Sequence, residues 1–153
     1  MPDMLVKLYD LPDRSEWLLP DNIKIRKPIA AEMSFVGDWV RKYFNERWRS
    51  EVLVSFSRVP CSCFIAAIGK DIAGFACYDS SGLGLFGPTG VRPNLRGKGI
   101  GKALLLSCLE DMRAKGYAYA VIGAVGPSRF YEKVAGAVLI PGSDASIFRR
   151  MIG

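Results

Sequence analysis

A turn of alternating glycines and basic residues stands two-thirds of the way along the chain. Its members are Arg96, Gly97, Lys98, Gly99, Ile100, Gly101 and Lys102. Glycine has no Cβ, so a ligand can come close to the backbone here. An apolar pattern typical of a helix follows directly, and the free N–H groups and dipole of a helix N-terminus attract anions. The turn therefore predicts a site for a phosphate or pyrophosphate.

Two common nucleotide motifs do not fit this turn. A P-loop would need glycine where Arg96 stands and Ser or Thr where Ala103 stands. A dinucleotide fingerprint needs the pattern Gly-x-Gly-x-x-Gly after the first strand of its unit. Here the pattern is Gly-x-Gly-x-Gly, and several candidate strands precede it. Neither the P-loop nor the dinucleotide fingerprint therefore matches the residues and position of this turn.

A second motif lies roughly thirty residues further on and runs Gly126, Pro127, Ser128, Arg129, Phe130, Tyr131, Glu132, Lys133. The first turn, read as Arg-x-x-Gly-x-Gly before an Ala/Leu-rich helix, resembles the acetyl-CoA signature of the GNAT superfamily of N-acetyltransferases. The second motif resembles the same family's Phe-Tyr-Glu-Lys…Gly segment. The resemblance is strong from Val91 to Ala137 and only architectural before Leu83.

The resemblance implies that acetyl-CoA is the cosubstrate and that an amine attacks its thioester directly, without a covalent enzyme intermediate. The backbone N–H of Val91 would polarise the thioester carbonyl, and Tyr131 would protonate the departing thiolate. A phenol suits that role because its ordinary pKa of about 10 keeps it protonated at neutral pH. The residues expected to hold acetyl-CoA are Gly90, Val91, Arg96, Gly97, Lys98, Gly99, Ile100, Gly101 and Lys102.

The general base departs from the family pattern. Many members carry a glutamate on the central strand or the next one, but residues 83–91 and 119–125 contain no carboxylate. Asp79, Glu32 and a water ordered by Thr89 are alternative bases. A route without a base, in which the amine arrives neutral, is a further alternative.

Two rival functions remain. A CoA or acyl-CoA sensor would keep the fold without turnover. A nucleic-acid module would use a basic and aromatic cluster, Arg41, Lys42, Tyr43, Phe44, Arg47, Trp48 and Arg49. That cluster is better explained as the solvated face of two amphipathic helices bordering the acceptor site, and CoA itself suits a basic protein. No nucleic-acid partner is expected. The acceptor is a small-molecule or peptide amine whose identity stays open.

Composition bounds the remaining classes. The 153 residues, half of them hydrophobic, with a net charge of +6, predict one domain over residues 1–153. The chain has no histidine, so His-based catalysis is excluded, and its four cysteines lack zinc spacing, so no metal is expected. Cys77 and Cys108 fall on apolar elements and are expected to be buried. The absence of a signal-like segment or an apolar membrane span favours a cytoplasmic protein without membrane contact.

The elements that must position these residues alternate along the chain. We expect strands at 5–9, 23–26, 63–68, 72–78, 83–91, 119–123, 137–140 and 147–150. Helices are expected at 30–43, 45–57, 99–115 and after Gly126. The predicted fold class is α/β (α+β): a GNAT-like mixed, mostly antiparallel sheet with a splayed parallel central pair and helices on both faces. Closing strands at its edge are compatible with a homodimer. The acceptor pocket is expected from the first two helices and the loops near Ser80 and 141–143.

Overall fold

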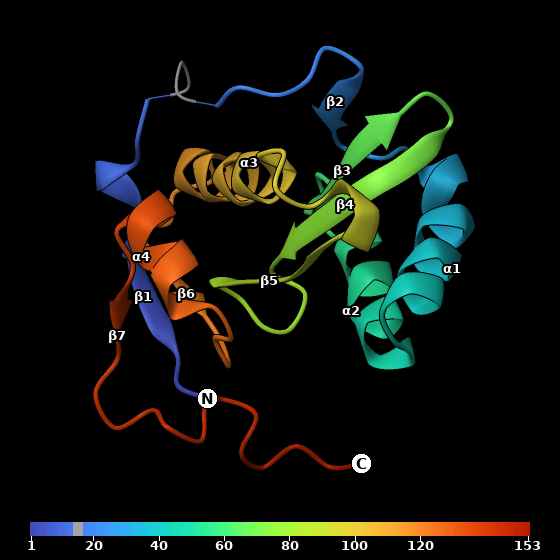
Figure 1. Cartoon of the computed structure of the whole chain (residues 1–153). Helices are drawn as coiled ribbons and strands as arrows, with labels where there is room; N and C mark the ends of the chain where they lie inside the picture. The colour runs from blue at the N-terminus through green and yellow to red at the C-terminus, as the bar shows by residue number, and fades with distance from the viewer. Residues whose placement is uncertain (14–16) are drawn as a thin grey trace.

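The computed structural model describes residues 1–13 and 17–153. In this part of the chain seven strands form one sheet in the order β2-β3-β4-β5-β6-β1-β7 (Figure 1). The strands are β1 (Met4–Lys7), β2 (Ile23–Arg26), β3 (Cys63–Ile68), β4 (Asp71–Tyr78), β5 (Leu85–Val91), β6 (Tyr119–Ile122) and β7 (Val138–Leu139). Every neighbouring pair is antiparallel except β5 and β6, which run parallel. This arrangement confirms the predicted fold class.

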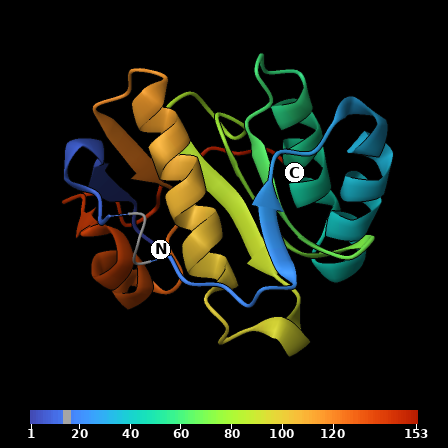
Figure 2. The same cartoon turned by 90° about the horizontal axis from the view of Figure 1, so that it is seen from above.

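The α-helices are α1 (Met33–Tyr43), α2 (Glu46–Phe56), α3 (Ile100–Ala114) and α4 (Ser128–Ala135). Figure 2 shows α1 and α2 on the opposite side of the sheet from α3. The ends of two helices follow from local chemistry. Asn45 caps α2 by accepting a hydrogen bond from the backbone N–H of Trp48 at 2.8 Å. Gly136 ends α4 in the left-handed region, with a φ of 65°.

Each face of the sheet has its own apolar core. On one face α3 contributes the fully buried Leu104, Leu106 and Leu109, which join residues of α4 and β1. On the other face Trp39 and Val40 of α1 and Val52 of α2 pack against β3 and β4. The predicted burial of Cys77 and Cys108 is confirmed. The sheet thus lies between two helix layers, and its central strands can support a site.

The central parallel pair separates soon after it forms. Only Leu85 and Phe86 of β5 pair with β6, although β5 continues to Val91. On its other side β5 keeps pairing with β4, with one irregularity: β4 advances from Ala76 to Tyr78 while β5 takes one residue more, from Phe86 to Thr89. An extra residue of this kind is a β-bulge and bends its strand. The predicted splay is confirmed, and β5 has an unpaired edge beyond Phe86.

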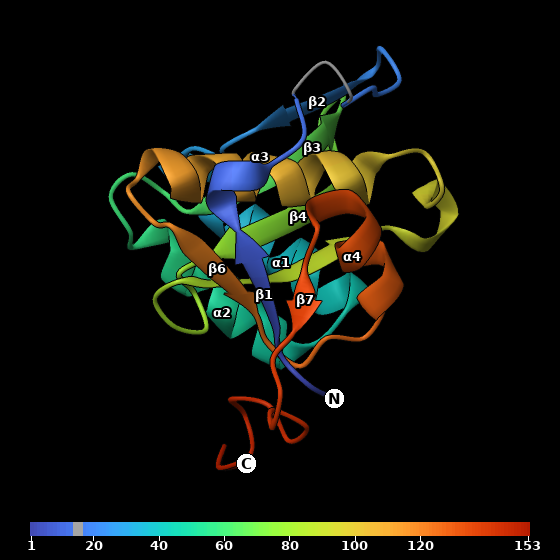
Figure 3. The same ribbon diagram turned by 90° about the vertical axis from the view of Figure 1, so that its left-hand side faces the viewer.

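The closing strands differ from the prediction. Strand β7 exists, but residues 147–150 form turns, so the predicted strand pair between 137–140 and 147–150 is wrong. Strand β1 instead pairs with both β6 and β7 and lies between them (Figure 3). Because β1 supplies this pairing, residues 147–150 are not needed in the sheet, and Ile147 and Phe148 pack over Gly123.

Candidate active site

A cavity of about 790 Å³ opens where β5 and β6 separate. Its lining comes from β5, from the turn before α3, from the segment between β6 and α4, and from α2. Of the nine residues predicted to hold acetyl-CoA, all but Lys98 line this cavity, and so does Tyr131. The structure therefore brings together two motifs that are well separated in the sequence.

The turn before α3 offers free backbone donors to the cavity. Gly97 and Gly99 both have a φ of 82°, in the left-handed region that favours glycine, so the turn could not form with larger residues unstrained. Gly99 is the N-cap of α3 and has no side chain to cap it. The first intrahelical bond runs from Ala103 N–H to Gly99 C=O at 3.0 Å. The N–H groups of Ile100, Gly101 and Lys102 therefore have no intrahelical acceptor.

Positive side chains surround this turn. Within the described residues no ion pair engages Arg96, Lys98 or Lys102. Arg96 Nε donates to the carbonyl of Val91 at 3.3 Å, which fixes the guanidinium beside the end of β5. Lys98 points elsewhere, since it does not line the cavity. The anion-attracting charge at the cavity thus comes from Arg96 and Lys102 together with the helix N-terminus.

The backbone of β5 faces the cavity at alternate residues. Arg92 N–H donates to the carbonyl of Ala73 at 2.8 Å, and Gly90 is the partner of Phe75. In an antiparallel ladder, bonded pairs alternate with non-bonded ones. Gly90 therefore bonds to β4, whereas the N–H groups of Val91 and Thr89 point away from β4 toward the side that β6 has left.

Gly90 has a packing role as well as a place at the cavity. A Cβ at this position would collide with the ring of Phe44. Only glycine lets the aromatic ring lie this close to β5. The contact of Gly90 with acetyl-CoA stays a prediction.

Tyr131 extends from the first half of α4 into the cavity wall. Its side chain is 7% exposed and contacts Phe86 and Phe130, with ring centroids 6.3 and 5.1 Å away. Burial raises the pKa of Tyr131 to about 12. Within the described chain its hydroxyl has no hydrogen-bond partner. The arrangement provides a protonated donor aimed at no protein acceptor.

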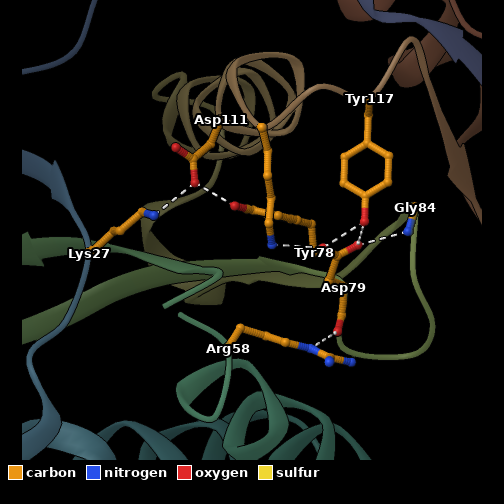
Figure 4. Close-up of polar contacts among 8 residues, drawn as sticks. Lys27, Arg58, Tyr78, Asp79, Gly84, Asp111 and Tyr117 are labelled. Carbon is orange, nitrogen blue, oxygen red and sulfur yellow. Dashed lines mark hydrogen bonds and ion pairs between the residues drawn. The ribbon is translucent and has the colours of Figure 1, made fainter. Parts of the chain in front are cut away.

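Asp79, one candidate base, is a fully buried structural carboxylate (Figure 4). It accepts hydrogen bonds from the Tyr117 hydroxyl at 2.9 Å and the Gly84 N–H at 2.7 Å, and it pairs with Lys115 Nζ at 3.2 Å. Its own carbonyl accepts from Arg58 Nε at 3.0 Å. Asp79 does not line the cavity. It anchors the loop between β4 and β5 to the end of α3.

Glu32, the other carboxylate candidate, also lies away from the cavity. Both of its oxygens bind Arg26, at 2.8 and 2.7 Å, and one also accepts the Ile29 N–H at 2.9 Å. The Arg26 hydrogen bond is the main cause that lowers the pKa of Glu32 to about 2. Thr89, proposed to order a water, lines the cavity but donates its hydroxyl to the Phe75 carbonyl at 3.1 Å.

The end of the cavity opposite the glycine turn contains residues that sequence reasoning missed. Glu51 of α2 lines the cavity and accepts a hydrogen bond of 2.6 Å from the hydroxyl of Ser81. Ile147 and Phe148 line it too. The available sequence signal for Glu51 was its spacing of three residues from Trp48, which puts both on one helix face. Of the expected acceptor elements, α2 and the loop near Ser80 reach the cavity, whereas α1 and 141–143 are outside the described lining.

The basic and aromatic cluster is largely used in packing. Phe44 and Trp48 lie 5.1 Å apart, ring to ring, and both contact the buried Phe75, at 5.7 and 6.1 Å. Arg41 and Arg49 form ion pairs with Asp38. The rings of Phe44 and Trp48 are therefore half-buried against the core rather than forming an exposed stacking surface, whereas Arg41, Lys42 and Arg47 are exposed. The predicted solvated face is thus formed by the basic residues and not by these two rings.

No helix among residues 1–13 and 17–153 is long and apolar enough to cross a membrane. In the same residues no group of three or more acidic, cysteine or histidine side chains could hold a metal ion.

Solved structures share this fold. A GCN5-related N-acetyltransferase from Sphaerobacter thermophilus is 22% identical, with a TM-score of 0.72 over 91% of this chain and 48% of that one. A GNAT family acetyltransferase from Brucella melitensis in complex with acetyl-CoA is 19% identical, with a TM-score of 0.57 over 77% of this chain and 86% of that one. A GCN5-related N-acetyltransferase from Kribbella flavida is 16% identical, with a TM-score of 0.62 over 90% of this chain and 53% of that one.

The chain spans about half the length of the Sphaerobacter and Kribbella proteins, and most of the length of the Brucella protein. At these identities the likeness establishes a shared fold. A comparison with curated proteins finds no match. The model of the acetyltransferase (GNAT) family matches residues 29–137, well over half of the chain and all of the cavity's central wall from Leu85 to Tyr131. The chain belongs to the GNAT acetyltransferase family.

Proposed function

We propose that the protein transfers an acetyl group from acetyl-CoA to an amine, and that both meet in the cavity between β5 and β6. One observation carries this proposal: a single cavity joins the uncapped glycine turn, the unpaired edge of β5 and Tyr131. The solved Brucella relative is a complex with acetyl-CoA, which supports the choice of donor.

The donor would lie along the splayed strands. Its pyrophosphate would bind the N–H groups of residues 99–102, with Arg96 and Lys102 adding positive charge. Single helix-end contacts are worth only about 0.3–1 kcal/mol, so several must act together. The pantetheine arm would pair with the outward groups of β5, as an added strand does.

The reaction would be a direct attack of the amine on the thioester carbon. The N–H of Val91 points to the open side of β5 and could donate to the developing oxyanion. The N–H of Thr89, two residues earlier on β5, points to the same side. As the C–S bond breaks, the Tyr131 hydroxyl would donate its proton to the thiolate. These donors would be preorganised, which is where electrostatic stabilisation of a transition state is most effective.

Calorimetric titration of acetyl-CoA into the purified protein tests the proposal, with Arg96→Glu as the variant. We expect saturable binding that the charge reversal weakens at least tenfold, which corresponds to about 1.4 kcal/mol. Arg113→Glu is a matched control, because it makes the same charge change at the other end of α3, on an exposed residue. It should leave the affinity unchanged.

A folded protein that does not bind acetyl-CoA would overturn the proposal. A nucleic-acid module would instead show affinity for bulk DNA or RNA that falls steeply with salt, and CoA would not compete. A sensor would bind acetyl-CoA and fail to acetylate any amine.

A further inference from the structure

One carboxylate faces the cavity. Among the described residues that line it, Glu51 is the sole acidic side chain, and Arg47, Arg96 and Lys102 are basic. The basic residues Arg96 and Lys102 belong to the glycine turn, whereas Glu51 belongs to α2 at the other wall. The part of the cavity near the glycine turn therefore suits the phosphates of the acetyl donor, whereas Glu51 on the other wall attracts a cation.

Glu51 is held in place but not neutralised. The Ser81 hydroxyl donates to its Oε1 at 2.6 Å, which fixes the carboxylate, and Oε2 has no partner in the described chain. Arg47, one turn earlier on α2, is turned to Phe148, with the guanidinium carbon 5.8 Å from the ring centroid. No ion pair joins Arg47 to Glu51 within these residues. The second oxygen and the charge are available to a ligand.

Most side chains that line the cavity together with Glu51 are apolar. Trp48 lies one turn away on the same face of α2, Leu85 and Phe86 come from β5, and Phe148 comes from the C-terminal segment. Phe86 also contacts the ring of Tyr131 at 6.3 Å, so the apolar wall extends to the proposed proton donor. A ligand with one positive charge and an apolar body would match these surroundings.

We infer that Glu51 binds the ammonium group of the acceptor and takes its proton, and that the acceptor is a monoamine carried on an apolar or aromatic group. This inference rests on the proposed acetyl transfer. A polyamine is a poor fit because, among the described residues of the lining, no second carboxylate would bind its further ammonium groups. An amino sugar is a poor fit because its hydroxyls would lose water against apolar walls.

The proton balance follows from these positions. The ammonium gives one proton to Glu51, and the neutral amine attacks the thioester carbon, forming the C–N bond. The C–S bond then breaks, and the thiolate takes the proton of Tyr131. The amide nitrogen, still carrying one proton too many, releases it to restore Tyr131 through solvent. Glu51 returns its proton to water, so the products are an amide, free CoA and one proton.

The test compares three amines with acetyl-CoA: phenethylamine, spermidine and glucosamine. We expect the wild-type kcat/KM for phenethylamine to be at least tenfold above the other two. In Glu51→Gln, which keeps the shape but removes the charge and the proton acceptor, kcat/KM for phenethylamine should fall about 10²-fold, the lower range for losing a general base. The affinity for acetyl-CoA should not change.

A second amine separates proton transfer from binding. Fluorination beside the amine lowers its pKa, so β,β-difluorophenethylamine arrives largely neutral. With this acceptor, the difference in kcat/KM between wild type and Glu51→Gln should shrink several-fold. Most of that change should come from kcat. Glu46→Gln is the matched control, since Glu46 lies on the same helix, outside the cavity lining, and loses the same charge. Ser81→Ala should lower kcat/KM less than Glu51→Gln, because Ser81 only positions the carboxylate.

Each outcome decides the inference. Equal activity of Glu51→Gln and wild type, or a preference for spermidine or glucosamine, would overturn it, as would failure to acetylate any of the three. If acetyl-CoA still binds in that case, the donor half of the proposed function survives, so the two failures are distinguishable. Should Glu51→Gln not fold, Ser81→Ala and Glu51→Asp carry the test, and unchanged kcat/KM in both would overturn the inference.

Discussion

The protonation of Tyr131 depends on where the side chain lies. Burial raises its pKa to about 12 because a phenolate would lose its hydration in the cavity wall. At neutral pH the hydroxyl therefore keeps its proton, and within the described chain no side chain accepts it. A proton donor that is buried, unbonded and open to the cavity suits a leaving thiolate.

Tyr131→Phe tests this role. The variant keeps the ring contacts with Phe86 and Phe130, so the fold and the acetyl-CoA affinity should be unchanged. Loss of a general acid typically lowers the rate by about 10²–10⁴-fold, and we expect kcat to fall in that range. Steady-state kinetics measures the fall in kcat, and calorimetry on the same preparation measures the affinity for acetyl-CoA. A variant with the wild-type rate would show that another group, or water, protonates the thiolate.

The junction between β2 and α1 is fixed by a bidentate ion pair. Arg26 ends β2, and Glu32 belongs to a 3-10 turn that leads into α1. The two side chains are 45% and 31% exposed, so the pair contributes under about 1 kcal/mol. Its contribution is to set the direction in which α1 leaves the sheet edge.

This pair makes stability depend on pH in the acid range. The pKa of Glu32 is lowered from 4.5 to about 2 in the folded protein. The stabilisation is therefore complete above the unfolded pKa and is lost as the pH falls from 4.5 toward 2. Urea unfolding across that interval should show a steeper fall in the free energy of unfolding for wild type than for Glu32→Gln. Parallel curves would mean that the pair does not stabilise the folded state.

At the scale of the molecule, the N-terminal strand closes the half of the sheet that carries α4. Met4 is fully buried and pairs with Ile122 of β6 and Leu139 of β7. Strand β1 lies outside the family match at 29–137, yet it pairs with β6 inside that match and with β7 directly after it. We infer that the wall behind Tyr131 depends on β1.

Met4→Ala tests this dependence against Leu104→Ala in α3, which is also fully buried. Substitutions of this kind cost about 2–5 kcal/mol. We expect both variants to lose stability in that range in a single cooperative urea transition. A loss at Met4 well below the loss at Leu104 would identify β1 as an appendage rather than part of the core.

The local features of the fold could be predicted from the sequence. The boundaries of β3 follow from a short apolar run between turn residues, and those of β2 from alternating isoleucine and basic residues. The helical spacing of apolar residues predicted α1 to α3. The bulge was indicated by Gly87 and Pro88 within the central strand. All of these features are set by residues that are close together along the chain, so the sequence pattern is enough to predict them.

The candidate site divides in the same way. The glycine turn and Tyr131 were found because each sits in a dense local motif. Glu51 was missed because it is an ordinary charged residue on an amphipathic helix, and its spacing of three residues from Trp48 does not by itself indicate a site. It became a candidate site residue only when the fold placed α2 beside the loop that carries Ser81.

The sequence by itself determined where the helices, the glycine turn and most of the strands lie, because hydrophobic period, glycine conformation and helix ends are local properties. Only the tertiary structure decided which strand closes the sheet and which carboxylate faces the cavity. Strand β1 took the place between β6 and β7, and Asp79 was buried among Lys115 and Tyr117. Such choices depend on which distant segments bury each other's surface, and that competition is settled across the whole molecule.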